Sequence, residues 1–255
     1  GCFGLAFLSK EYTITLVFLL PLALYTFRKY SLKDSILAFA PYVLVIGAYW
    51  LLRHSIVAPP SENSETEVLN NPYLFASSVE KLATEISTSL NYLKLLIFPH
   101  PLSADYSYDS IPYKDFSRPL VWLSLAVHIG LVVIMIAMIR KRSVLSFAIA
   151  FYLLHLALVC NIFFDIGATM GERLIYHSSV GFAIAVAYFL VTGTKKLQPE
   201  ESGIRVLAGI LGVVTILAGI KTISRNADWK NDATLFEADI NTVPNSVLVC
   251  ANVAA

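Results

Sequence analysis

Residues 119–142 read PLVWLSLAVHIGLVVIMIAMIRKR, a long uncharged run that ends in three consecutive basic residues. A helix needs about 20 mostly apolar residues to cross the hydrocarbon core of a bilayer, and this run is long enough. Basic residues in short loops are typical of the cytoplasmic side of a membrane. The stretch therefore predicts a membrane-spanning helix followed by a cytoplasmic turn.

The composition of the whole chain agrees with a membrane protein. Of its 255 residues, 56% are hydrophobic and only 15% are charged, whereas charged residues make up about a quarter of an ordinary soluble domain. The net charge of +1 and the lack of a basic stripe with interleaved aromatic residues argue against a nucleic-acid partner. The three cysteines, Cys2, Cys160 and Cys250, are too scattered to indicate a metal site or a disulfide framework.

Other apolar segments are also long enough to cross a membrane or nearly so. We predict spans at 12–27, 35–57, 144–164, 174–192 and 204–220. Residues 1–9 resemble the end of a further span, and the last residues stop within an apparent helix. No initiator Met or signal peptide is present at the start. We therefore expect the sequence to be a fragment that is cut at both ends.

The basic residues of the short loops set the orientation. They form three groups: Arg28, Lys29 and Lys33; Arg140, Lys141 and Arg142; and Lys195 and Lys196. All three groups fall on the cytoplasmic side only if the loop 58–118 begins and ends on the other face. We therefore interpret the charged segment 79–98 as an interfacial or re-entrant helix, although its length would also allow a span.

This topology brings the polar segments of the chain to the outer face. They are the corner at 9–11, the loop 58–118, the corner at 165–173 and the tail after Lys221. Ionisable groups at a membrane edge are costly unless they have partners, so their clustering favours a shared site. The guanidinium of Arg173 suits bidentate binding of phosphate, and Glu172 could orient it. The alternative for Lys10 and Glu11 is a pair of charged side chains that reach water from a helix end.

The segment FPHPLSADYSYDSIPYKDF at 98–116 closes the long loop and is rich in tyrosine and carboxylate. Aromatic rings beside carboxylates are common in sugar sites, where rings cover C–H surfaces and carboxylates bind hydroxyl groups. The candidates here are His100 and Asp105. The alternative is a belt of tyrosines at the membrane interface.

The tail has the pattern of a helical hairpin. Trp229, Leu235, Phe236 and Ala238 recur at helical spacing, and residues 246–254 begin a second helix. Such a hairpin is typical of tetratricopeptide repeats, which bury their apolar faces only against neighbouring repeats. A simple juxtamembrane helix is the alternative. We divide the chain into a membrane region at 1–222 and the truncated start of a repeat region at 223–255.

Four motifs together resemble a known family. They are GLAFLSKEYTIT at 4–15, LLIFPHPLSADYSYDSIP at 95–112, GERLIYHSSVGF at 171–182 and RNADWKNDATLFEADINTVPNS at 225–246. In this order they resemble the membrane half of the transmembrane and tetratricopeptide-repeat O-mannosyltransferases and their bacterial relatives, which are GT-C-type glycosyltransferases. The resemblance covers nearly the whole chain.

The resemblance implies an all-α polytopic membrane bundle of the GT-C type. It implies an enzyme of the bacterial inner membrane or the endoplasmic reticulum, with the long loop and the tail on the periplasmic or lumenal side. The partners would be membrane lipid, a polyprenyl-phosphate sugar as donor, and a protein or glycan acceptor held by the repeat region. The donor is a substrate, so no cofactor is implied.

The resemblance also assigns residues. Lys10, Glu11 and Arg173 would line the phosphate of the donor, and His100 and Glu172 are further substrate-binding candidates. Asp105 would be the catalytic acidic residue of the aromatic loop. The principal catalytic carboxylate of the family lies in a first outer loop, which would precede Gly1, so the fragment is expected to be inactive alone.

Two other classes of protein remain open. A transporter or flippase of a lipid-linked solute would carry ionisable residues near the centres of its spans and inverted repeats. A membrane-anchored tetratricopeptide scaffold without catalysis would need no cluster of polar residues.

Overall fold

The computed structural model describes residues 2–56, 67–69, 71–196 and 200–254. All the regular elements within these ranges are helices, which confirms the predicted all-α class. The helices of the first half are α1 (Cys2–Ser9), η1 (Glu11–Thr15), α2 (Leu16–Phe27), α3 (Leu32–Leu37), α4 (Ala40–Ile56) and α6 (Ser78–Ile97). Those of the second half are α7 (Pro119–Ile139), α8 (Val144–Ala157), η2 (Glu172–Ile175), α9 (Tyr176–Thr194), α10 (Glu200–Asp228), α11 (Asp232–Asp239) and α12 (Val247–Ala254).

Within the described residues, four helical segments are long and apolar enough to cross a membrane. They are Leu32–Ile56, Pro119–Ile139, Glu172–Thr194 and Glu201–Asp228. Two shorter apolar helices, Tyr12–Phe27 and Val144–Ala157, accompany them. Each overlaps a predicted span, because long apolar runs are the strongest signal that a sequence carries for membrane helices.

The structure changes the bounds of two predicted spans. The span expected at 144–164 ends as a helix at Ala157. Beyond it Asn161 adopts a positive φ of 63° and its side-chain amide donates to the carbonyls of Ala168 and Thr169, at 2.9 and 3.1 Å. Asparagine tolerates this left-handed conformation better than most residues, so it organises a loop there. In contrast, α10 is longer than predicted. It continues past the expected end at 220 and through the expected domain boundary to Asp228.

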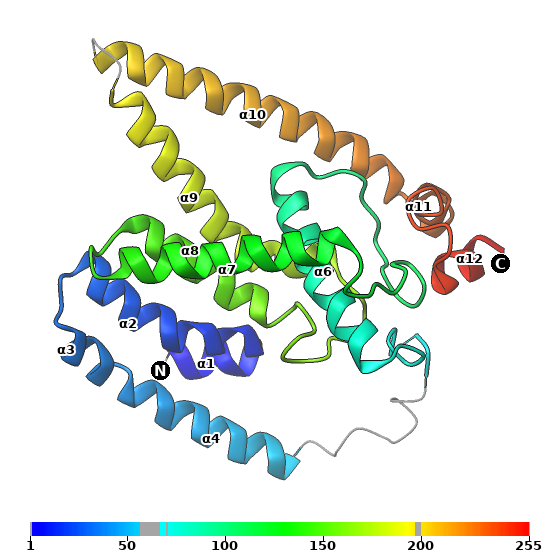
Figure 1. The fold of residues 1–255 in the computed structure, drawn as a ribbon, viewed down its shortest axis with the longest axis horizontal. Coiled ribbons are helices and arrows are strands. Elements are labelled where there is room, and N and C mark those ends of the chain that lie inside the picture. Colours follow the sequence, from blue (N-terminus) through cyan, green and yellow to red (C-terminus); the bar gives the residue numbers. More distant parts are fainter. Residues whose placement is uncertain (1, 57–66, 70, 197–199, 255) are drawn as a thin grey trace.

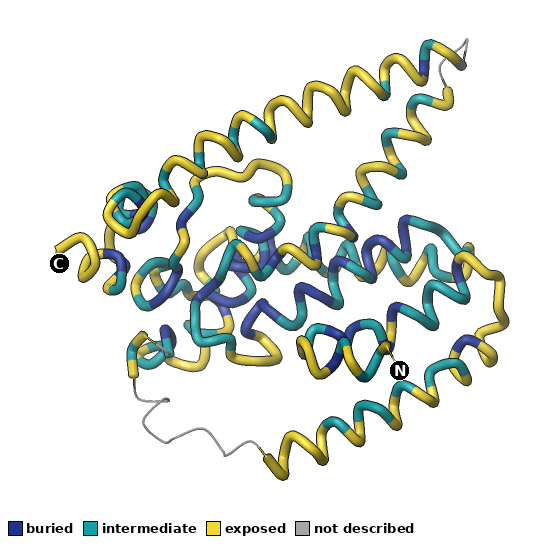
Figure 2. The backbone as a smooth tube through the Cα atoms, turned by 180° about the vertical axis from the view of Figure 1, so that it is seen from behind, coloured by how far each residue is buried: buried dark blue, intermediate teal, exposed yellow. Residues whose placement is uncertain are grey.

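Helix α8 lies at the centre of the bundle and packs against α7, α9 and α2. Figure 1 shows α9 and α10 close together at one end of the molecule and diverging toward the other. Figure 2 shows that α10 is exposed along most of its length. Because the large side chains exposed between Ile204 and Ile223 are mostly apolar, we expect this part of α10 to face lipid.

Two of the basic loops meet at one end of the bundle. A guanidinium nitrogen of Arg142, Nη2, donates to the carbonyl of Tyr30 at 3.0 Å, and the same guanidinium lies 4.4 Å from the centre of the Tyr25 ring. The loops that follow α2 and α7 are therefore adjacent, as a common cytoplasmic face requires.

The helix predicted at 79–98 is α6, and it is confirmed as a helix. It begins with a capping box, in which Ser77 Oγ accepts from the Glu80 N–H at 3.3 Å and Glu80 Oε2 accepts from the Ser77 N–H at 2.9 Å. Helix α6 buries a run of polar side chains, among them Thr84, Ser87 and Thr88. Its interfacial or re-entrant position remains a prediction.

Glu85, in the middle of α6, is only 3% exposed, and burial raises its pKa to about 7, partly opposed by Lys81 at 3.9 Å. The folded state therefore holds a proton that the unfolded carboxyl releases near its ordinary pKa of about 4.3. This contribution to stability is complete below pH 4 and is lost as the pH rises to about 7.

Glu85→Gln imitates the protonated side chain permanently. We expect it to melt near the wild-type temperature at pH 4 but several degrees higher at pH 8, a gain of roughly 3 to 4 kcal/mol. Thermal unfolding in detergent at the two pH values measures this, with the exposed Glu237→Gln as the control. An equal difference in melting temperature at both pH values would show that Glu85 does not titrate in this range.

Candidate functional site

A pocket of about 480 Å³ lies where four segments meet: the junction of α1 and η1, the loop at 103–106, the corner at 166–174 and the residue after α10. Four of the predicted site residues line it, namely Lys10, Asp105, Glu172 and Arg173. These residues are far apart in the sequence, so only the tertiary fold brings them together. That this pocket is a functional site, and that it lies on the outer face, stay predictions.

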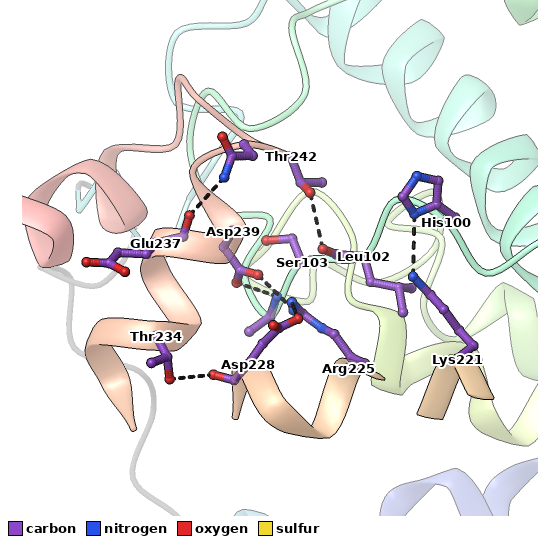
Figure 3. Close-up of polar contacts among 12 residues, drawn as sticks. His100, Leu102, Ser103, Lys221, Arg225, Asp228, Thr234, Glu237, Asp239 and Thr242 are labelled. Atoms are coloured by element: carbon purple, nitrogen blue, oxygen red, sulfur yellow. Dashed lines mark hydrogen bonds and ion pairs between the residues drawn. The ribbon is translucent and has the colours of Figure 1, made fainter. Parts of the chain in front are cut away.

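The other two predicted residues are His100, which is not part of the pocket lining, and Glu11. His100 is exposed, and its Nδ1 lies 3.4 Å from Nζ of Lys221 on α10, as Figure 3 shows. The backbone of Glu11 begins η1, but its side chain lies outside the described part of the structure.

The two cations of the pocket gather around Tyr12. Lys10 has extended backbone dihedrals (φ −156°, ψ 134°), which separate α1 from η1, and its Nζ lies 5.8 Å from the centre of the Tyr12 ring. Arg173, in the first turn of η2, interacts electrostatically with the Tyr12 hydroxyl. None of the ion pairs within the described residues involves Lys10 or Arg173. Two cations without a counter-ion among the described residues suit an anionic ligand, and the arginine suits phosphate in particular.

Glu172 faces the aromatic loop. Its Oε1 accepts from the N–H of Ser103 at 2.7 Å and from the hydroxyl of Tyr106 at 2.8 Å. Burial and the neighbouring Glu172 carboxylate raise the pKa of Tyr106, so its hydroxyl stays protonated and donates. Through these contacts Glu172 connects the loop at 103–106 to η2, which leads into α9. The sequence had suggested instead that Glu172 orients Arg173.

One oxygen of Asp105 is held firmly by its surroundings. Oδ2 accepts from the N–H of Ser107 at 3.0 Å, from the hydroxyl of Ser107 at 2.7 Å and from the hydroxyl of Ser246 at 3.0 Å. Because these donors come from the loop and from the start of α12, the carboxylate is fixed where it lines the pocket.

Aromatic side chains complete the lining. Tyr12, Tyr106 and Trp229 line the pocket, and the sequence interpretation missed all three as site residues. Tyr12 stacks on His177 with ring centres 4.7 Å apart, and His177 stacks on His155 at 5.6 Å. The place of Tyr12 next to Lys10 and Glu11 was a signal that could have been used. The sequence carries no such signal for Trp229, because the position of this residue depends on where α10 ends.

The described residues contain no group of three or more His, Cys, Asp or Glu side chains that could hold a metal ion. The lining of the pocket includes two cations, two carboxylates and three aromatic rings. Such a lining can bind an anion at one part and hydroxyl groups at another.

These features define a multi-span membrane protein with a charged and aromatic pocket at one end of its bundle. The chain is distantly homologous to protein O-mannosyl-transferases, which confirms the resemblance seen in its motifs. It is 29% identical to protein O-mannosyl-transferase TMTC4 of Mus musculus over 239 residues, which cover 87% of this chain and 30% of that protein. It is 26% identical to protein O-mannosyl-transferase TMTC3 of Homo sapiens over 164 residues, covering 62% and 18%, respectively. It is 25% identical to protein O-mannosyl-transferase F38B6.6 of Caenorhabditis elegans over 186 residues, covering 72% and 26%.

The chain thus spans less than a third of the length of these relatives. No family model matches it, and no solved structure does so.

Proposed function

We propose that this chain is part of a membrane glycosyltransferase that moves a sugar from a polyprenyl-phosphate donor to a hydroxyl group of a protein or glycan acceptor. The observation that carries the proposal is the pair Lys10 and Arg173, which share a pocket with Asp105 and have no counter-ion among the described residues. The names of the relatives, protein O-mannosyl-transferases, support a mannose-like sugar and a protein acceptor.

In this mechanism the phosphate of the donor binds between Lys10 and Arg173. The acceptor oxygen attacks the anomeric carbon, the bond from that carbon to the phosphate oxygen breaks, and the electron pair stays on the phosphate. The two cations stabilise the charge that develops there. The acceptor proton passes to a carboxylate, for which the family resemblance implies an upstream loop, while Asp105 binds and orients a reacting hydroxyl group.

We place the pocket on the periplasmic side of a bacterial inner membrane or on the lumenal side of the endoplasmic reticulum. The contact between Arg142 and Tyr30 supports this orientation, because it joins two basic loops at one end of the bundle. The polyprenyl chain would lie in the bilayer beside the apolar spans, with its phosphate at the membrane surface.

We also propose that α11 and α12 begin a repeat region that holds the acceptor. The two helices pack on each other, as the first pair of a tetratricopeptide array would. The greater length of the relatives leaves room for further pairs in the complete protein.

The test is sugar transfer by the full-length protein in nanodiscs, supplied with undecaprenyl-phosphate mannose and, separately, with the glucose analogue of that lipid. Asp105→Asn should lower transfer about 100-fold while donor binding changes little, because the amide can keep the contacts to Ser107 and Ser246 but lacks the charge. Asp109→Asn is the matched control, since Asp109 belongs to the same loop but is exposed outside the pocket.

The outcomes separate the classes of protein. Equal transfer by the wild type and Asp105→Asn would remove Asp105 from the mechanism. Donor binding with movement of the lipid between leaflets, but without transfer, would indicate a flippase. If the protein binds neither lipid, the remaining class is the membrane-anchored scaffold without catalysis.

A further inference from the structure

The segment after the last span is bound tightly to the aromatic loop. Asp239, on α11, is completely buried, and its Oδ1 accepts from Nη2 of Arg225 at 2.7 Å. Its other oxygen, Oδ2, accepts from the N–H of Ala104 at 2.7 Å. Figure 3 shows Asp239 between the end of α10 and the loop. One carboxylate therefore joins α10, α11 and the wall of the pocket.

Three further hydrogen bonds connect the same two parts of the chain. The hydroxyl of Thr242 donates to the carbonyl of Leu102 at 3.3 Å, and the N–H of Val247 donates to the carbonyl of Tyr108 at 3.3 Å. The hydroxyl of Ser246 donates to Asp105 itself. The loop from 102 to 108 is thus held along its length by residues beyond α10.

We infer that Arg225 and Asp239 position the 102–108 loop, and with it Asp105 and Tyr106, at the pocket. The segment after the last span then completes the site, in addition to any role in holding an acceptor. Arg225 and Asp239 touch no substrate in this scheme and act through the loop.

The physical basis is the burial of the pair. The side chain of Arg225 is 13% exposed and that of Asp239 is fully buried, so their attraction is weakly screened by solvent. A buried carboxylate that accepts from both a guanidinium and a backbone N–H has few other ways to satisfy its charge. The backbone at Ala104 is therefore confined, and Asp105 follows it in the chain.

Asp228 offers a matched control. It also pairs with Arg225, at 3.0 Å to Nη1, but its side chain is 36% exposed and makes no contact with the loop within the described residues. Asp228→Asn removes a similar charge from the same arginine and leaves the contact of Asp239 with Ala104 in place.

The experiment measures hydrogen–deuterium exchange and sugar transfer for the full-length protein. In Asp239→Asn we expect exchange at residues 103–107 to become about 10-fold faster while α7, α8 and α9 keep their protection. We expect kcat for transfer to fall about 10-fold, because small displacements of reacting groups are costly, with KM for undecaprenyl-phosphate mannose within 3-fold of wild type. Asp228→Asn should change each quantity less than 2-fold.

Ser246→Ala is the second variant, because it loosens Asp105 without leaving a buried charge unpaired, and it should speed exchange at the same loop. Unchanged exchange in both variants would overturn the inference. So would exchange that rises evenly along the chain in Asp239→Asn, since the pair would then support the whole fold. The kinetic part rests on the proposed function, whereas the exchange part does not: a wild type without transfer refutes the proposed function, and exchange still decides the role of the pair.

Discussion

Arg173→Ala is expected to weaken binding of undecaprenyl-phosphate mannose about 100-fold and to reduce sugar transfer to a similar extent. Arg173 lines the pocket and no ion pair of the described residues occupies it, so its charge is available to the donor. A hydrogen bond to a charged group contributes about 1.5–3 kcal/mol, and a bidentate contact with phosphate loses two such bonds. Donor binding is measured by titration of a short-chain, detergent-soluble analogue.

Arg205→Ala is the control for this experiment, because Arg205 is an exposed arginine on α10 that pairs with Glu201. Arg173→Lys should recover part of the affinity, since it restores the charge but not the planar fork. The melting temperature of Arg173→Ala should stay close to that of the wild type, because the side chain is exposed. Unchanged donor affinity would mean that Arg173 is only a charged residue at a helix start.

Gly181→Ala is expected to destabilise the bundle strongly. Gly181 lies on α9 where it meets α8, and an added Cβ would come within 2.5 Å of the carbonyl oxygen of Ala148 and of the nitrogen of Tyr152. Both are backbone atoms of a helix, so α8 and α9 must move apart. Overpacking of this kind costs about 1–3 kcal/mol or more, and close helix contacts of small residues are a main source of cohesion inside a membrane.

Gly193→Ala is the control on the same helix, since a Cβ there meets nothing within 4 Å. It should be neutral or stabilise the helix by up to about 1 kcal/mol, as alanine favours helix more than glycine does. Thermal unfolding in detergent compares the two variants. Equal melting temperatures would show that α8 and α9 are not held by this contact.

The spans could be predicted from the sequence because they depend on local composition. A run such as 119–139 is apolar whatever its neighbours are, and α7 follows it from Pro119 to Ile139. The ends of helices were harder. The predicted span at 144–164 overran α8 because Asn161 makes its loop through contacts with the residues at 168 and 169. The predicted span at 204–220 ended too early because the residues after 220 are mostly polar. These residues nevertheless continue α10 to Asp228.

The candidate site was partly predictable for a different reason. The topology alone puts Lys10, Asp105 and Arg173 on one face, and the structure gathers them into one pocket. The partners of each side chain were not predictable. Adjacency in the chain suggested a pair of Glu172 with Arg173, but Glu172 bonds to Ser103 and Tyr106, about 70 residues earlier. Likewise, nothing local in the sequence links Asp239 to Ala104.

Because α10 is one continuous helix, we expect the pocket to respond to the thickness of the bilayer. The helix has 29 residues and is therefore about 44 Å long, and it leads directly to Trp229. A helix that is longer than the hydrocarbon layer adapts to a thinner membrane by tilting. A change in tilt of about 5° displaces one end of such a rod by about 4 Å relative to the other. Arg225 and Trp229 lie at that end, so we expect a change in lipid chain length to move this wall of the pocket through the tilt of α10.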